Sequence, residues 1–246
     1  METTRLNHHR ESYTPSWEPE RYIVPLLAQR IPELIHQFCE LPHVGARALD
    51  AGCGMQPFRR LIEQNGYQYT GMDVVQNRTD SVDILGALDE PLSPELQMTK
   101  AFDMILCTEV LEHVAGWSVA FDNLAHLLAP NGRILLTCPH FYPLHEEPYD
   151  FWRPTPYAID HFAKSCGLRV VHAERAGGPW EVLGTLLAET HCYPSSRSIV
   201  YRLAAKTIST FRSFLVHGLQ SSWWRSRIAL KGPYFLSNLA VLEVAR

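Results

Sequence analysis

The sequence lacks several features that would indicate a zinc-binding, secreted or membrane-spanning protein. Its six cysteines lie at least fourteen positions apart, which excludes a C-x-x-C zinc or redox pair. The first twenty residues are polar and contain no apolar signal core. No apolar run approaches the roughly 18 residues that a membrane-spanning helix needs. We therefore expect a reduced, cytoplasmic location.

Acidic side chains are absent from one long stretch near the C-terminus. Between Thr190 and Ala240 there are seven basic residues and no Asp or Glu. The net charge of the whole chain is −4 and that of this segment is +7, so the remaining residues carry a net charge of −11. An acidic chain with a pI of about 6.3 gives no general reason to expect a nucleic-acid partner.

Strand-like and helix-like patterns alternate along the chain and predict one α/β domain over residues 19–246, preceded by a flexible arm at residues 1–18. Alternation of this kind is typical of a mostly parallel sheet covered by helices on both faces. The predicted helices are 19–40, 57–64, 117–128 and 156–166, and the predicted strands are 46–51, 67–72, 82–85, 102–107, 133–138, 168–173 and 236–244.

The basic stretch forms part of a helical insert expected at about 179–230, before the last strand. At helical spacing, Val200, Leu203, Phe211 and Phe214 fall on one arc and Arg202 on the opposite arc. Three interpretations follow. The insert is a lid with its apolar face over the substrate pocket, a helix lying on a membrane surface, or a dimer contact. Trp223 and Trp224 would suit a membrane interface.

The turn Leu49-Asp50-Ala51-Gly52-Cys53-Gly54 ends the first strand and opens a helix, which favours a ligand site. Glycines allow close backbone approach, and a helix N-terminus offers free N–H groups to an anion. Asp73 ends the second strand nineteen residues after Gly54, where a carboxylate can bind a ribose diol. A dinucleotide is disfavoured, because Pro57 replaces the third glycine of G-x-G-x-x-G.

Four segments, ALDAGCG, YTGMD, FDMILCTEVLEHV and LLAPNGRILLTCPH, resemble in order and spacing the motifs of class I S-adenosylmethionine (SAM)-dependent methyltransferases. The resemblance implies a Rossmann-like three-layer sandwich, with a seven-stranded, mostly parallel sheet whose last strand is antiparallel. It also implies SAM as cofactor. In that site Gly52 and Gly54 line the methionine moiety, Asp73 holds the ribose, and Met72 and Val74 flank the adenine.

Other positions in the matching motifs are assigned to the same cofactor site, namely Asp50, Cys53, Leu88, Cys107 and Thr108. Two departures from the family pattern stand out. Gln56 occupies the place of a third motif glycine that many members have. The stretch 86–88 (Gly-Ala-Leu) has no acidic residue where many members place one near the adenine amine.

The loop after the fifth strand, residues 139–153, combines imidazoles, carboxylates, an arginine and aromatic rings. His145 is the candidate general base, because a neutral imidazole can accept a hydroxyl proton near pH 7. The alternative is a loop histidine bonded to Asp150 or to the backbone. The candidate substrate-binding residues are Tyr142, His140, Trp152 and Arg153, although an internal ion pair of Arg153 and aromatic core packing are alternatives.

Glu109, Glu112 and His113 stand at i, i+3 and i+4, which on a helix puts them on one face. Such a set could hold a divalent cation, with His140 or His145 completing the shell. The pattern is similar to metal-binding stretches in ubiquinone-pathway O-methyltransferases and small-RNA terminal 2′-O-methyltransferases. We predict no metal, and interpret the three residues as a hydrogen-bonded helix start.

The loop PLHEEPYDFWRPT and the GCGMQPFR turn resemble a type 11-like bacterial methyltransferase branch often linked to glycan or secondary-metabolite assembly. The sequence therefore predicts SAM-dependent O-methylation of a small molecule or saccharide. The alternatives are a metal-dependent RNA or nucleotide 2′-O-methyltransferase and a catalytically degenerate binding partner. Nothing in the sequence indicates an oligomeric state.

Overall fold

The computed structural model describes residues 12–39, 44–93, 96 and 102–245. Most of the predicted N-terminal arm, residues 1–11, lies outside the described residues. Along the part of the chain that the structure describes, no helix has the length and apolarity to cross a bilayer.

A seven-stranded sheet organises the chain, with the strand order β3-β2-β1-β4-β5-β7-β6. Neighbouring strands from β3 to β5 are parallel, whereas β7 is antiparallel to both β5 and β6. The predicted Rossmann-like sandwich with an antiparallel last strand is thus confirmed. The strands are β1 (Arg47–Ala51), β2 (Gln68–Asp73), β3 (Ile84–Leu85), β4 (Phe102–Thr108), β5 (Leu128–Pro139), β6 (Leu168–Ala176) and β7 (Ser237–Val244).

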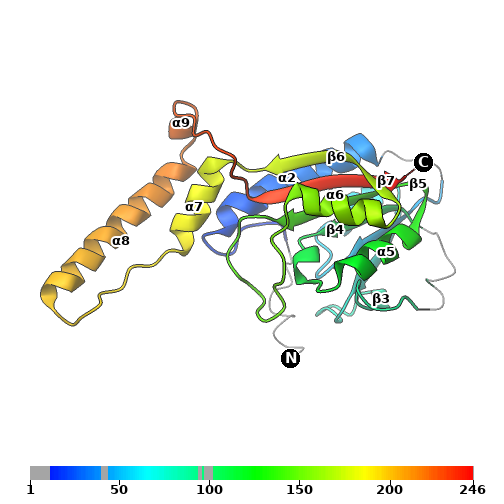
Figure 1. Ribbon diagram of the computed structural model, residues 1–246, viewed down its shortest axis with the longest axis horizontal. Helices are drawn as coiled ribbons and strands as arrows, with labels where there is room; N and C mark the ends of the chain where they lie inside the picture. Colours follow the sequence, from blue (N-terminus) through cyan, green and yellow to red (C-terminus); the bar gives the residue numbers. More distant parts are fainter. Residues whose placement is uncertain (1–11, 40–43, 94–95, 97–101, 246) are drawn as a thin grey trace.

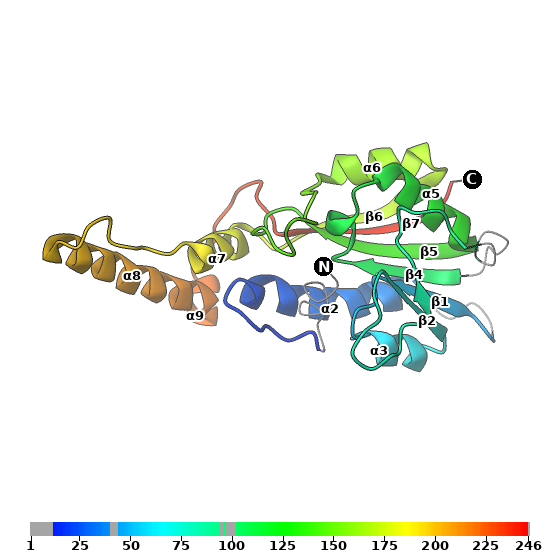
Figure 2. The ribbon, with the colours of Figure 1, turned by 90° about the horizontal axis from the view of Figure 1, so that it is seen from below.

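Helices cover both faces of this sheet (Figures 1 and 2). On one face lie α2 (Glu20–Phe38) and α3 (Arg59–Gln64), and on the other α5 (Trp117–Leu127) and α6 (Pro156–Ser165). Each helix layer buries an apolar cluster against the sheet. Two prolines, Pro25 and Pro32, stand inside α2 without dividing it into two helices.

The predicted ends of α6 follow from its capping residues. The Thr155 hydroxyl accepts the Ala158 backbone N–H, and Pro156 occupies the first helical position. Gly167, just past the helix, has a φ of +71°, which is the left-handed conformation that ends many helices. By contrast, β5 begins at Leu128 and not at Arg133, because the chain stays paired with β4 through an irregularity at Asn131, whose φ is +86°.

The insert between β6 and β7 contains α7 (Pro179–Glu189), α8 (Ile199–Gln220) and the short α9 (Ser222–Arg225). In both views α8 projects beyond the end of the sheet, with α9 at its base (Figures 1 and 2). At the base of α8, the Tyr22 hydroxyl of α2 donates to the Val216 carbonyl at 3.0 Å. Helix α8 therefore contacts the sheet domain near its C-terminal end, and its N-terminal end projects away from the sheet.

Candidate functional site

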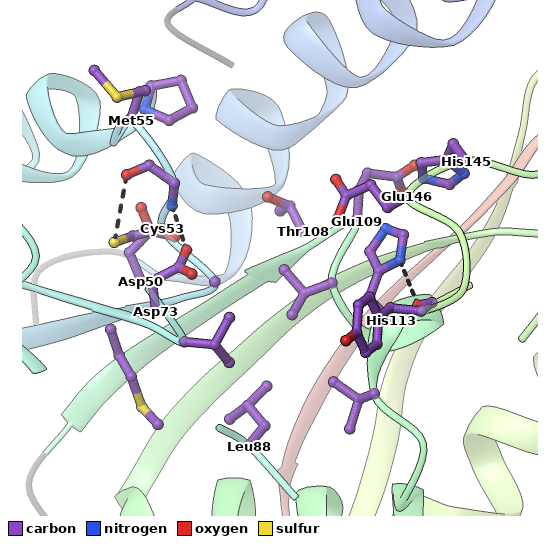
Figure 3. A pocket seen from close by; sticks show the side chains of 18 of the residues that line it. Asp50, Cys53, Met55, Asp73, Leu88, Thr108, Glu109, His113, His145 and Glu146 are labelled. Carbon is purple, nitrogen blue, oxygen red and sulfur yellow. Dashed lines mark hydrogen bonds between the residues drawn. The ribbon is translucent and has the colours of Figure 1, made fainter. Parts of the chain in front are cut away.

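A cavity of about 1300 Å³ opens where the carboxyl ends of β1, β2 and β4 meet. Open α/β sheets place their ligand sites at this edge. Typical pockets for one small molecule measure roughly 300–1,000 Å³, so this cavity has room for two. Figure 3 shows the loop around Cys53 on one side, His113 and His145 on the other, and Thr108 between them.

The turn after β1 brings bare backbone to the cavity. Gly52 has a φ of +77°, and a Cβ at this position would lie 2.3 Å from a Val110 methyl carbon. Both conditions require glycine. The Gly52 and Cys53 N–H groups donate to the Met72 carbonyl, which ties the turn to the end of β2.

Gln56, the residue at the missing third motif glycine, has a φ of +59°. The position therefore keeps the left-handed conformation that glycine would adopt at little cost. Its side chain donates to the Ser81 carbonyl at 2.6 Å and accepts from Arg59 at 3.2 Å. These contacts offset the conformational cost, so the turn keeps its shape without the glycine.

Asp73 is the acidic residue that the glycine turn faces. It is only 7% exposed, and its Oδ2 accepts the Gly54 N–H at 2.9 Å. The turn is also held by Asn77, whose side-chain amide donates to the Gly54 carbonyl at 2.8 Å. Sequence reasoning did not single out Asn77. Its signal was the N-R-T-D-S turn, where an Asn side chain commonly bonds nearby backbone groups.

Asp50 lies beneath the turn and is buried beside Tyr69, whose hydroxyl donates to Oδ2 at 2.8 Å. Burial raises the pKa of Asp50 from its ordinary 3.8 to about 7, and the Asp73 charge adds to this shift. The Tyr69 hydrogen bond acts in the opposite direction. Asp50 is therefore an acid that holds its proton up to about neutral pH.

We expect Asp50→Asn to flatten the pH dependence of stability. Between pH 3.8 and about 7 the folded state retains a proton that the unfolded state releases, so the free energy of unfolding falls as the pH rises. A shift of this size corresponds to about 4 kcal/mol at most. Urea unfolding from pH 4 to pH 8 measures the slope in wild type and variant.

Asp122→Asn is the matched control for that experiment, because Asp122 is exposed on α5. We expect this control to keep the wild-type slope. Equal slopes for wild type and Asp50→Asn would show that Asp50 does not carry the raised pKa.

The apolar part of the predicted cofactor site is distributed around the same cavity. Met72, Val74, Leu88 and Thr108 all line it. Cys107 does not, because it is fully buried in the sheet core beneath Thr108. An acidic residue does stand next to the 86–88 stretch: Asp89 lines the cavity, and its carboxylate accepts the Gly116 N–H at 3.0 Å.

His145 lies on the opposite wall, in the loop after β5. Its Nδ1 is 3.3 Å from Asp150 Oδ2 and 3.2 Å from the Pro143 carbonyl. Asp150 is fixed in turn by Arg153, whose two terminal nitrogens each approach it to 2.6 Å. Acceptors at Nδ1 favour the tautomer that carries its proton there, and Nε2, which lies 3.9 Å from the Glu112 carboxylate, is then the unprotonated nitrogen.

Among the four candidate substrate residues, only Tyr142 lines the cavity. His140 stacks on Phe235 with ring centroids 4.1 Å apart, and its Nδ1 is 2.9 Å from the Pro154 carbonyl. The Trp152 indole packs against Trp117 and donates to the Val114 carbonyl. Arg153 takes the internal pairing with Asp150. These three side chains therefore support the loop from behind the cavity wall.

The described end of the N-terminal segment also contributes to the cavity. Trp17 packs edge-on against Tyr142, with ring centroids 6.1 Å apart, and Tyr13 packs against Phe58 at 4.7 Å. Both aromatic residues line the cavity. Residues 12–18 therefore form part of its wall. Sequence reasoning did not place any residue of this segment in the site.

The expectation that Glu109, Glu112 and His113 share one helix face is wrong. Glu109 has a φ of +53°, so the helix cannot begin there, and only one 3-10 turn, Leu111–His113, forms. The Glu109 carboxylate accepts the hydroxyls of Thr137 at 2.8 Å and Ser237 at 3.2 Å, on the tops of β5 and β7. Its carboxylate is therefore held by the sheet and does not join the ligand atoms of Glu112 and His113.

A different trio comes together. Single ligand atoms of Glu112, His113 and His145 all lie within 4.8 Å of one another. Glu112 is fully buried, and neither of its carboxylate oxygens has a hydrogen-bond partner among the described residues. His113 Nδ1 is 2.9 Å from the Tyr149 carbonyl, which leaves its Nε2 facing Glu112 at 3.8 Å.

Burial from water dominates the electrostatics of Glu112 and His113. Burial, together with the Glu109 charge, raises the pKa of Glu112 well above its ordinary value. Burial lowers the pKa of His113. Two imidazoles with their Nδ1 atoms engaged and a carboxylate without partners are a donor set that suits a divalent cation.

Of the three interpretations of the amphipathic insert, the lid over the substrate pocket disagrees with the structure. No α8 residue lines the cavity, and Val200, Leu203, Phe211 and Phe214 of α8 are exposed to solvent. The physical reason is that α8 packs with its opposite side, where Arg212 donates to the Leu187 and Ala188 carbonyls at the end of α7. The apolar face is therefore turned away from the sheet domain.

Comparison with known proteins connects this geometry to one chemistry. A family model described as a methyltransferase domain matches residues 24–205, almost three quarters of the chain. Ubiquinone biosynthesis O-methyltransferase from Xylella fastidiosa (strain 9a5c) is 29% identical over 133 residues, which cover 49% of this chain and 53% of that protein. Its counterpart from Xanthomonas oryzae pv. oryzae (strain PXO99A) is 28% identical over 139 residues, covering 49% and 54%. The chain spans about half the length of the curated relatives it matches.

Solved structures share the fold. A putative sarcosine dimethylglycine methyltransferase from Galdieria sulphuraria superposes with a TM-score of 0.57 at 14% identity, covering 98% of both chains. An O-methyltransferase from a trans-AT PKS multienzyme of Brevibacillus brevis, in complex with S-adenosyl-L-homocysteine, gives 0.55 at 15% identity, covering 92% of this chain and 75% of that one. At these identities the likeness is one of fold.

Proposed function

Because this chain belongs to the family of SAM-dependent methyltransferases, we propose that it methylates a hydroxyl oxygen of a small molecule or saccharide. One observation carries the choice of oxygen: His145, oriented by Asp150, faces the cavity opposite the glycine turn. A hydroxyl acceptor must lose a proton, and an imidazole that is unprotonated at Nε2 can take it. The curated relatives named O-methyltransferases support the same choice.

The residues on the glycine side fit the cofactor. Gly52 leaves the turn without a side chain, and Asp73 presents a nearly buried carboxylate of the kind that binds a ribose diol. When bound, SAM supplies a methyl group on a positively charged sulfur, which is a good leaving group. The protein then has to hold the acceptor oxygen in line and keep water out.

The acceptor side supplies orientation and proton transfer. His145 Nε2 takes the hydroxyl proton as the new bond to oxygen forms, and the Asp150 carboxylate stabilises the resulting imidazolium through Nδ1. Tyr142 and Trp17 provide an aromatic wall that excludes water from this part of the cavity. The acidic sheet domain makes a polyanionic acceptor a poor match.

A second candidate function is favoured by the unpartnered Glu112 carboxylate. In this version Glu112, His113 and His145 hold a divalent cation, and the acceptor is an RNA or nucleotide 2′-hydroxyl. A bound cation would lower the pKa of a coordinated hydroxyl. The chain's own contribution would then be to keep Nδ1 of both histidines engaged, by Tyr149 in one case and by Asp150 and Pro143 in the other.

Methyl transfer from labelled SAM into a cell extract distinguishes these functions. After the reaction the extract is separated into lipid, glycan, small-molecule and RNA pools, with and without EDTA. We expect label in the glycan or small-molecule pool, unchanged by EDTA. Label in RNA that EDTA abolishes and Mg²⁺ or Mn²⁺ restores would establish the second candidate.

A degenerate binding partner would give no label in any pool. Calorimetric titration with S-adenosylhomocysteine separates this case from a missing acceptor: a degenerate chain would not bind it, whereas an active enzyme without its acceptor would. The matched control is Gly52→Val, which places a branched side chain where a single Cβ already meets Val110 at 2.3 Å.

A further inference from the structure

Helix α8 exposes a row of large apolar side chains to solvent. Val200, Leu203, Phe211 and Phe214 are each between 58% and 67% exposed, and they lie along one stripe of the helix, here called the outer stripe. The two buried residues of α8, Val216 and Leu219, lie on the opposite side near its base, together with the half-buried Ala205, Ser209 and Arg212. Leaving two phenylalanines of an amphipathic helix exposed to solvent is the reverse of ordinary packing.

The same insert carries exposed cations, of which Arg202 lies on the arc of α8 opposite the outer stripe. Arg197, Arg202 and Lys206 are exposed at the far end of the projecting helix. Beyond its base, Trp223 and Trp224 are exposed, and the Arg227 guanidinium lies 4.4 Å from the Trp223 ring centroid. No carboxylate occurs between Thr190 and Ala240. Exposed phenylalanines on α8, exposed tryptophans on α9 and cations in the same insert match an anionic lipid interface.

Charge also favours an anionic lipid surface over a second copy of the chain as the partner of the outer stripe. Two copies packed by their outer stripes would bring two basic segments into one assembly, and neither segment contains an acidic residue between Thr190 and Ala240 to compensate the other. An anionic bilayer surface attracts the same cations and accepts the apolar side chains at its headgroup boundary. The rest of the chain carries −11 and is repelled by that surface, which favours contact through the projecting helix alone.

We propose that α8 is a peripheral membrane anchor whose outer stripe and flanking cations bind an anionic lipid surface. The interaction is reversible, because one amphipathic helix buries only its apolar face. It is distinct from the methyltransferase reaction, since no α8 residue lines the cavity. Methyl transfer to a water-soluble acceptor therefore does not depend on it.

Co-sedimentation with vesicles tests this anchor on the full chain. We expect binding to vesicles of phosphatidylcholine with phosphatidylserine, at least tenfold weaker binding to phosphatidylcholine alone, and weakening with added salt. The double variant Phe211→Ser/Phe214→Ser should lose at least tenfold in partitioning to the anionic vesicles. Arg202→Gln/Lys206→Gln should lose binding mainly at low salt.

The matched apolar control is Tyr157→Ser, because Tyr157 is 74% exposed on α6 of the sheet domain. The matched charge control is Arg60→Gln, an exposed cation outside the insert. Both should bind vesicles as wild type does. All these positions are exposed, so thermal unfolding should show the same midpoint throughout.

Two results would overturn the anchor. In the first, wild type ignores anionic vesicles, or the outer-stripe variant binds them as well as wild type does. In the second, sedimentation shows a wild-type dimer that Phe211→Ser/Phe214→Ser converts to a monomer, with no vesicle binding by either. That outcome would assign the outer stripe to a second copy of the chain.

Discussion

Replacing His145 with alanine is expected to lower turnover by about 10²- to 10⁴-fold while leaving the affinity for SAM unchanged. General-base catalysis typically contributes a factor of this size. His145 lies across the cavity from the glycine turn, so its loss removes no contact to the cofactor. Single-turnover rates at saturating SAM measure the first effect, and calorimetry with S-adenosylhomocysteine measures the second.

The control for this variant is His36→Ala, because His36 is exposed on α2 and does not line the cavity. It should be fully active. The turnover of Asp150→Asn should lie between those of His36→Ala and His145→Ala, because the variant keeps the loop in place but weakens the orientation of the imidazole. A His145→Ala enzyme with the wild-type rate would remove His145 as the base.

The pH profile then separates a base from a metal ligand. If His145 is the base, the variant's rate should rise with pH beyond the wild-type plateau, because the acceptor hydroxyl ionises without help. If His145 holds a cation with Glu112 and His113, excess Mn²⁺ should restore the variant's rate and EDTA should abolish the wild-type rate. Glu112→Gln should then lower Mn²⁺ affinity, measured by calorimetry, as much as His145→Ala does.

The sheet could be predicted closely because its signals are local. The central strands β4 and β5 contain short apolar runs, β6 shows an alternating pattern, and the order of motifs determines the strand order once the family pattern is recognised. The ends of α6 followed from Thr155 and Gly167 for the same reason. The start of β5 did not, because Pro130-Asn131-Gly132 signals a turn while pairing with β4 holds the strand through it.

The second wall of the cavity depends on contacts between distant segments, which the sequence does not specify. The i, i+3, i+4 spacing placed Glu109 with His113, but hydroxyls on β5 and β7 hold the Glu109 carboxylate and its backbone adopts a positive φ. His145 joins Glu112 only because the 139–153 loop folds back over the 3-10 turn, where the Phe151 N–H donates to the Glu112 carbonyl.

The orientation of α8 shows the same limit. The periodicity located its apolar face correctly, and burial on folding would ordinarily turn that face inward. The Arg212 contacts to α7 and the Tyr22 bond to Val216 determine instead which side packs. The small residues Ala205 and Ser209 on that side were the signal in the sequence that it could pack closely.

Replacing Asp73 with alanine is expected to weaken SAM binding at least tenfold. Each hydrogen bond from a ribose hydroxyl to this carboxylate is worth roughly 1.5–3 kcal/mol, so two of them exceed the 1.4 kcal/mol that a tenfold change requires. The variant also loses the 2.9 Å bond that positions the Gly54 N–H. Calorimetric titration with SAM and with S-adenosylhomocysteine gives the change in affinity directly.

Two further variants separate ribose binding from support of the turn. Asp73→Asn keeps an acceptor for the Gly54 N–H but removes the charge, so its affinity for SAM should lie between those of wild type and Asp73→Ala. Asp83→Ala removes an exposed carboxylate that accepts the Gly71 N–H at 2.7 Å but does not line the cavity, so it should bind SAM normally. If Asp73→Ala binds SAM as wild type does, another group holds the ribose. If Asp83→Ala is equally weakened, the loss comes from the β2 backbone and not from a contact to the cofactor.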